Sequence, residues 1–122
     1  GAGHPPAFAQ LPGGPLTRLV SAGIPINTGL PIVARETASM ARRPDLRILL
    51  YTDGYAESTN RDGHPFDEPD AEGTSPFERA VHAALNAEST PLGLEAFEAA
   101  WSAFVPGGRA SDDRAAVLAR LR

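Results

Sequence analysis

The most continuous apolar stretch of the chain covers residues 46–51 (Leu-Arg-Ile-Leu-Leu-Tyr). Such a stretch is typical of a strand buried within a sheet, so we predict a central β-strand here. It ends at Thr52-Asp53-Gly54. Asp followed by Gly is typical of a tight reversal, because glycine adopts a positive φ without steric cost.

Weaker patterns predict four more strands. Residues 6–11 and 16–20 flank the turn sequence Pro-Gly-Gly-Pro at 12–15, which predicts a β-hairpin. Residues 32–37 are β-branched with partial polar alternation, as in a partly exposed strand. A last strand is predicted over 115–121.

The first predicted helix begins after Ser75, with Pro76 at its first position and Glu78 completing a capping box. Apolar residues then recur at helical spacing along one face. They are Phe77, Ala80, Val81, Ala84 and Leu85.

A second helix is predicted to open at Thr90-Pro91 and to stop at Gly107-Gly108. Its apolar stripe consists of Leu94, Phe97, Trp101, Phe104 and Val105. Residues 60–73, rich in Asp, Glu, Gly and Pro, are expected to form a long, mobile surface loop. The order β-β-β-β-α-α-β indicates an α+β domain.

Composition limits the classes of function. With 122 residues, 42% of them apolar, the chain has the size of one globular domain. No apolar run is long enough to span a bilayer, and no signal peptide is evident. Met40 is the only methionine, so we expect that the natural N-terminus was removed. The absence of Cys excludes disulfides and thiolate chemistry and fits a cytoplasmic protein.

The charge pattern does not favour a nucleic-acid partner. The net charge is -4, and the basic residues are all arginines, spread among acidic residues. Nucleic acids bind concentrated basic surfaces, so we discount them.

Two acidic residues stand at the ends of predicted strands. Asp53 follows the strand at 46–51, and Asp112 precedes the last strand. If these strands are antiparallel neighbours, the two carboxylates meet at one edge of the sheet. Such oxygen ligands suit Mg²⁺ or Mn²⁺. The alternative is an ordinary turn at Asp53 and a polar loop at Asp112. Two carboxylates are also few for a binuclear site, whose ions lie about 3.5–4 Å apart.

Three ordered motifs resemble those of the PPM family of metal-dependent protein phosphatases. They are Ala-Gly-His-Pro-Pro at 2–6, Leu-Leu-Tyr-Thr-Asp-Gly at 49–54 with Glu57 and Asn60 following, and Ser-Asp-Asp at 111–113 before a final strand. The SpoIIE-like branch, which includes sigma-factor-regulating phosphatases, is the most similar. The resemblance implies that Asp53 and Asp112 are metal ligands, with Gly54 and Asp113 beside them. His4 matches a motif position, where we expect a structural role.

The chain departs from the family pattern at several positions. Pro25-Ile26-Asn27 replaces a Pro-Leu-Gly turn, Phe66-Asp67 replaces a Phe-Gly pair, and Ala115 replaces a common Thr. A larger departure is that the family's Gly-Asp-Gly segment, whose Asp bridges both metals, is not found in this sequence. We therefore expect residues 1–122 to be the C-terminal half of the domain, part of an α-β-β-α sandwich of antiparallel sheets.

The resemblance implies hydrolysis of phosphoserine or phosphothreonine by a metal-activated water, with Mn²⁺ or Mg²⁺ as cofactor. The substrate it implies is a phosphorylated anti-anti-sigma (STAS-type) protein. We predict that the isolated chain binds Mn²⁺ weakly and is nearly inactive. Without the other half of the sandwich, exposed apolar faces and strand edges would also favour self-association of this chain. The competing hypothesis is a non-catalytic interaction module.

Other candidate sites carry weak patterns. His4, His64 and His82 lack the i, i+4 spacing of a helical zinc site, and a phosphate-binding Gly-Lys-Ser/Thr cannot occur without Lys. Trp101, with Phe97 and Phe104, is predicted to pack in the core.

Overall fold

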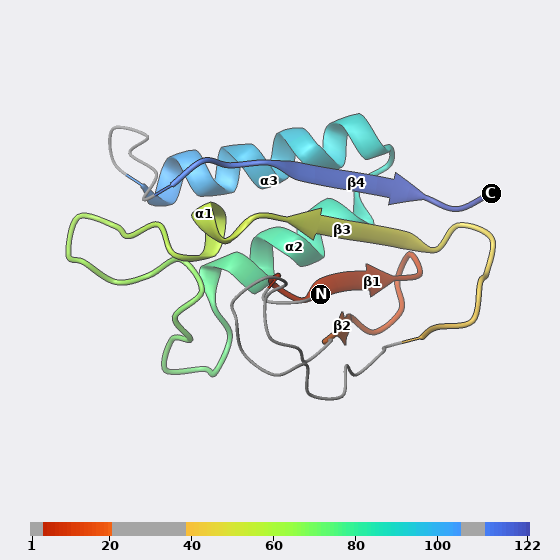
Figure 1. Cartoon of the computed structure of the whole chain (residues 1–122), viewed down its shortest axis with the longest axis horizontal. Coiled ribbons are helices and arrows are strands. Elements are labelled where there is room, and N and C mark those ends of the chain that lie inside the picture. The colour runs from red at the N-terminus through yellow and green to blue at the C-terminus, as the bar shows by residue number, and fades with distance from the viewer. Residues whose placement is uncertain (1–3, 21–38, 106–111) are drawn as a thin grey trace, which may run out of the picture.

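The structure, a computed structural model, describes residues 4–20, 39–105 and 112–122. Its four strands are β1 (Ala7–Gln10), β2 (Thr17–Leu19), β3 (Arg47–Tyr51) and β4 (Ala116–Arg120). The helices are α1 (Asp53–Ala56), α2 (Pro76–Asn86) and α3 (Thr90–Phe104). The strands form an antiparallel sheet in the order β2-β1-β3-β4, and α2 and α3 pack together against one of its faces (Figure 1). The predicted α+β class is confirmed.

Strand β3 is internal, as its apolar sequence predicts, with β1 on one side and β4 on the other. Leu49 pairs with Phe8 of β1 and with Leu118 of β4, and all three side chains are buried. They join a core built with the helices, whose largest fully buried members are Trp101, Phe66, Phe97 and Leu49. The predicted strand at 32–37 and the helix stop at 107–108 lie outside the described residues.

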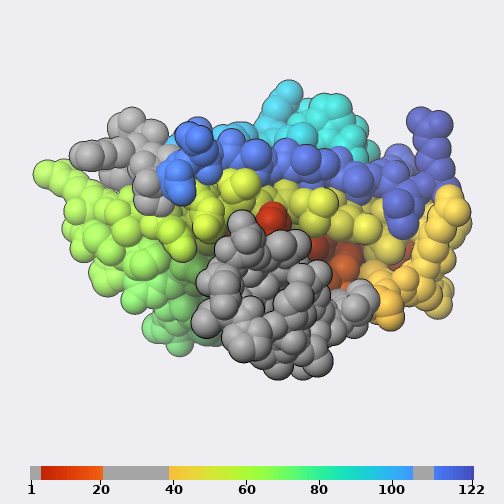
Figure 2. Space-filling model, viewed as in Figure 1, coloured from red at the N-terminus to blue at the C-terminus, as the bar shows by residue number. Residues whose placement is uncertain are grey.

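The other face of the sheet is apolar and exposed over β3 and β4. Side chains alternate between faces along a strand, so Leu50 points away from the buried Leu49. Its register partner is Val117, and the two are 46% and 58% exposed. We call the surface around Leu50 and Val117 the open sheet face. In Figure 2 the β3 and β4 segments form adjacent bands across it.

Arg47 is a buried cation inside the β3 strand, 6% exposed. Its Nη1 donates to the carbonyl oxygen of Leu85 at 2.9 Å and to that of Ala87, at the C-terminal end of α2. Helix C-termini carry partial negative charge and unpaired carbonyls, which stabilise a cation there. Arg47 therefore links β3 to the end of α2.

The segment between α1 and α2 is a loop, as predicted, and it is attached to the core. Phe66 is 1% exposed and packs edge-on against Phe77, with ring centroids 5.8 Å apart. Its backbone N–H donates to the carbonyl of Ser58 at 2.8 Å. None of the described helices is long and apolar enough to cross a membrane.

Both long helices begin at serine caps. The Oγ of Ser75 accepts the backbone N–H of Glu78 at 3.0 Å, so the predicted cap is confirmed. The N-cap of α3 is Ser89, whose Oγ accepts the N–H of Leu92 at 3.4 Å. Helix α3 ends at Phe104, with Val105 as its C-cap.

Replacing Ser75 by alanine is expected to lower the free energy of unfolding by about 1 kcal/mol, because the N–H of Glu78 loses its acceptor. Chemical denaturation monitored by circular dichroism measures this change. The control is Ser102→Ala, an exposed position inside α3, which should be neutral or slightly stabilising. Equal effects in the two variants would contradict a capping role.

Candidate metal centre

The structure places Asp53 and Asp112 at the same end of the β3–β4 pair. Asp53 is the first residue of α1, directly after β3, and Asp112 precedes β4. The strands are antiparallel, with Tyr51 opposite Ala116, which confirms the strand arrangement that the two-carboxylate hypothesis requires. Both aspartates are exposed.

Thr52 extends the pairing of the two chains beyond the strands. Its backbone N–H donates to the carbonyl of Ala115 at 3.0 Å. Its Oγ1 donates to the carbonyl of Asp113 at 3.1 Å and accepts the N–H of Ala115 at 3.0 Å. The sequence gives no indication of this role beyond the position of Thr52 in the Thr-Asp-Gly segment. Thr52 fixes the residues before Asp53 to those after Asp112.

The predicted tight reversal at Asp53-Gly54 is wrong. A short helix, α1, begins here, and among the described residues the glycines with positive φ are Gly13, Gly63 and Gly73. Glycine is required at position 54 for space. A Cβ there would lie 2.5 Å from the carbonyl oxygen of Asp113 and 3.0 Å from that of Asp112. The backbones carrying the two candidate ligands are therefore in direct contact.

Asp113 lies beside this contact with its own side chain exposed. Its backbone N–H donates to the Oδ1 of Asp112 at 2.7 Å, which orients that carboxylate. Its carbonyl oxygen faces Gly54 and accepts the hydroxyl of Thr52.

The donors present fit part of a site for a hard divalent cation. Asp53 and Asp112 contribute carboxylate oxygens, the ligand type that Mg²⁺ and Mn²⁺ prefer. Within residues 4–20, 39–105 and 112–122, however, no group of three or more His, Asp or Glu side chains is placed to hold a metal. Further ligands would have to come from elsewhere.

Side chains of helix α3 contact both acidic segments. Tyr55 of α1 is 2% exposed, donates its hydroxyl to Glu98 and packs against Trp101, with ring centroids 6.2 Å apart. Burial raises the pKa of Tyr55 above its ordinary value, and the hydrogen bond to Glu98 adds to the rise. On the other segment, the guanidinium carbon of Arg114 lies 3.4 Å from the centroid of Trp101.

The other singled-out residues do not gather at this edge. His4 is exposed before β1, His64 lies in the loop 2.9 Å from Glu68, and His82 is exposed on α2. Trp101 and Phe97 are buried, as predicted, and Phe104 is half-buried. Ala115, which replaces the family's common Thr, contacts Thr52 through its backbone N–H and carbonyl. The replacement at 25–27 lies outside the described residues.

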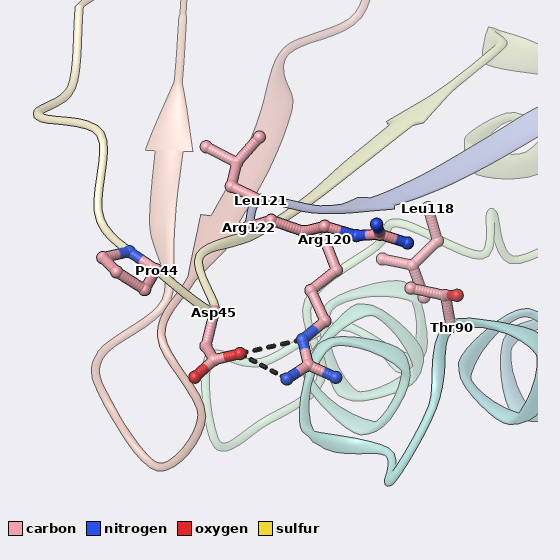
Figure 3. Close-up of a pocket in the computed structure, with 7 residues that line it drawn as sticks. All are labelled: Pro44, Asp45, Thr90, Leu118, Arg120, Leu121 and Arg122. Atoms are coloured by element: carbon pink, nitrogen blue, oxygen red, sulfur yellow. Dashed lines mark hydrogen bonds and ion pairs between the residues drawn. The ribbon is translucent and has the colours of Figure 1, made fainter.

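A pocket of about 590 Å³ lies at the opposite end of the β3–β4 pair (Figure 3). Asp45 and Arg120 form an ion pair in its lining, and Thr90 contributes from the start of α3. Asp45 precedes β3, whereas Asp53 follows it. The pocket is therefore separate from the acidic edge.

Comparison with known proteins gives a match to a family model. The model of the family described as Stage II sporulation protein E (SpoIIE) matches residues 1–122. Neither the search of curated proteins nor that of solved structures found a match.

Proposed function

This chain belongs to the stage II sporulation protein E (SpoIIE) family, and we propose that it is the C-terminal half of a PPM-type protein serine/threonine phosphatase domain. One observation carries the proposal beyond family membership. The backbone contact between Gly54 and Asp112-Asp113 brings the two motif aspartates, Asp53 and Asp112, to one edge of the sheet.

In this proposal, Asp53 and Asp112 hold the cation through their carboxylates, and Gly54 permits the close approach of their backbones. Asp113 orients the carboxylate of Asp112 through its backbone N–H. When bound, Mn²⁺ or Mg²⁺ would supply an acidified water and neutralise charge on the phosphoryl oxygens. The remaining ligands, including the bridging carboxylate of the family, would come from an upstream half of the domain.

The open sheet face supports the division into halves. Leu50 and Val117 expose apolar surface of the kind that a sandwich buries between two sheets. We propose that the sheet of an upstream half covers it, giving an α-β-β-α sandwich. Without that half, the same surface favours self-association.

The proposed substrate is a phosphoserine or phosphothreonine in a protein partner. By resemblance to the sigma-factor-regulating branch, we infer a phosphorylated anti-anti-sigma (STAS-type) protein in bacterial sigma-factor control.

Removal of the metal tests the proposed reaction. The full-length protein is expected to hydrolyse a phosphoserine peptide in the presence of Mn²⁺. Its rate should fall by more than about 100-fold in EDTA, because charge neutralisation by the metal lowers the activation barrier by several kcal/mol. Excess Mn²⁺ should restore the rate, measured as released phosphate. The 122-residue chain alone is expected to be nearly inactive. Undiminished turnover by the full-length protein in EDTA would refute metal dependence.

The second candidate is a non-catalytic interaction module. The described residues hold no group of three metal-ligating side chains, as both candidates predict, so this observation does not separate them. The upstream sequence separates the two candidates, since a Gly-Asp-Gly segment there favours the enzyme and its absence favours the module.

A further inference from the structure

One aromatic side chain contacts both segments that carry the candidate ligands. Trp101 of α3 is 2% exposed and packs against Tyr55, two residues after Asp53. Its ring also lies beneath the guanidinium of Arg114, two residues after Asp112, at 3.4 Å from the ring centroid. Trp101 is thus a common support for both sides of the acidic edge.

The residues between Asp112 and β4 are held at two points. Thr52 binds the carbonyl of Asp113 and both the N–H and the carbonyl of Ala115. Arg114 points instead to α3, where it stacks on Trp101 and lies 5.6 Å from the ring centroid of Tyr55. A planar guanidinium suits this contact, since it combines stacking with cation–π attraction. Arg114 therefore fixes this segment to the helix layer.

We propose that Arg114 is a positioning residue, whose contact with Trp101 holds Asp112 at the correct distance from Asp53 for metal binding. The inference rests on the proposed function, since it requires that Asp112 is a ligand. Residues that orient metal ligands commonly change metal affinity by about 10–100-fold when they are replaced.

The sign of the effect separates positioning from simple electrostatics. Arg114 carries a positive charge near the proposed cation, so charge repulsion alone predicts that its removal tightens Mn²⁺ binding. Positioning predicts the reverse, because Asp112 loses its fixed place when the contact with Trp101 is lost.

The test is calorimetric titration of the full-length protein with Mn²⁺. A second readout is the Mn²⁺ concentration that gives half-maximal phosphatase activity. Arg114→Met is expected to weaken Mn²⁺ binding by about 10-fold, with little change in melting temperature because Arg114 is exposed. Arg114→Lys should recover part of the affinity, since Lys retains a cation over the ring. The matched control is Arg120→Met, at the other end of β4, which should leave Mn²⁺ affinity unchanged.

Unchanged or tighter binding in Arg114→Met would overturn the inference and leave the proposed function intact. Absence of Mn²⁺ binding by the unsubstituted protein, or affinity unaffected by Asp112→Asn, would overturn both. If Arg114→Met does not fold, Arg114→Gln provides the same comparison, with the same deciding outcomes.

Discussion

Asp53→Asn is expected to reduce the Mn²⁺-dependent hydrolysis of a phosphoserine peptide by the full-length protein by more than about 100-fold, because even residues that only orient a ligand change affinity by 10–100-fold. Asparagine has nearly the same shape but no charge, so a direct ligand is weakened while the local structure is kept. Asp53 is exposed, which makes an indirect effect through folding small. Released phosphate, measured across a range of Mn²⁺ concentrations, gives both the rate and the metal requirement.

The matched control for this variant is Asp62→Asn. Asp62 is also exposed and also precedes a glycine, Gly63, but it lies in the loop between α1 and α2. Its replacement should leave both the rate and the Mn²⁺ requirement unchanged. If Asp53→Asn retained the activity of the control, the ligand role of Asp53 would have to be abandoned.

Gly54→Ala is expected to damage both stability and activity. The added Cβ would lie 2.5 Å from the carbonyl oxygen of Asp113, a backbone atom that cannot rotate away. Overpacking of this kind costs about 1–3 kcal/mol. Relief requires the two backbones to separate, which moves Asp112 away from Asp53. We therefore expect a lower melting temperature, and a fall in activity per folded molecule comparable to that of Asp53→Asn.

Gly93→Ala separates the two effects. A Cβ at Gly93 would lie 2.5 Å from the carbonyl oxygen of Ala84, between α2 and α3 and away from the aspartates. It should lower stability to a similar degree, yet leave the Mn²⁺ affinity of the folded molecules unchanged. Calorimetric Mn²⁺ titration below the melting temperature of each variant makes the comparison. Equal loss of Mn²⁺ affinity in both variants would show that Gly54 acts only through general stability.

Local sequence patterns predict the elements whose causes are local. The cap at Ser75 depends on residues three positions apart, and the end of β3 is marked by the change from apolar residues to Thr-Asp-Gly. The sequence predicts that Asp53 and Asp112 meet at one edge only if their two strands are antiparallel neighbours, and no local pattern decides that pairing. The ends of the predicted strands single out these residues and the family resemblance implies their ligand role, whereas the structure shows that their strands are neighbours.

Features that depend on distant contacts were not predictable in this way. The Asp-Gly pair predicts a turn at Gly54, but the surroundings of Gly54 are set by Asp112 and Asp113. Arg47 interrupts an apolar strand, and its partners are carbonyls at the end of α2. No local pattern marks Arg114 for a role, because its contact with Trp101 depends on how α3 packs.

The bonds between Thr52 and Ala115 join residues 63 positions apart in the sequence. Contacts this distant require closure of a long loop and tend to form late in folding. During synthesis, the strand with Asp53 therefore leaves the ribosome well before its partner exists. The acidic edge is assembled only when α2 and α3 have been made and β4 is added beside β3. A nascent or truncated chain that lacks β4 would present Asp53 without Asp112, so under the proposed function metal binding would have to wait until β4 is in place.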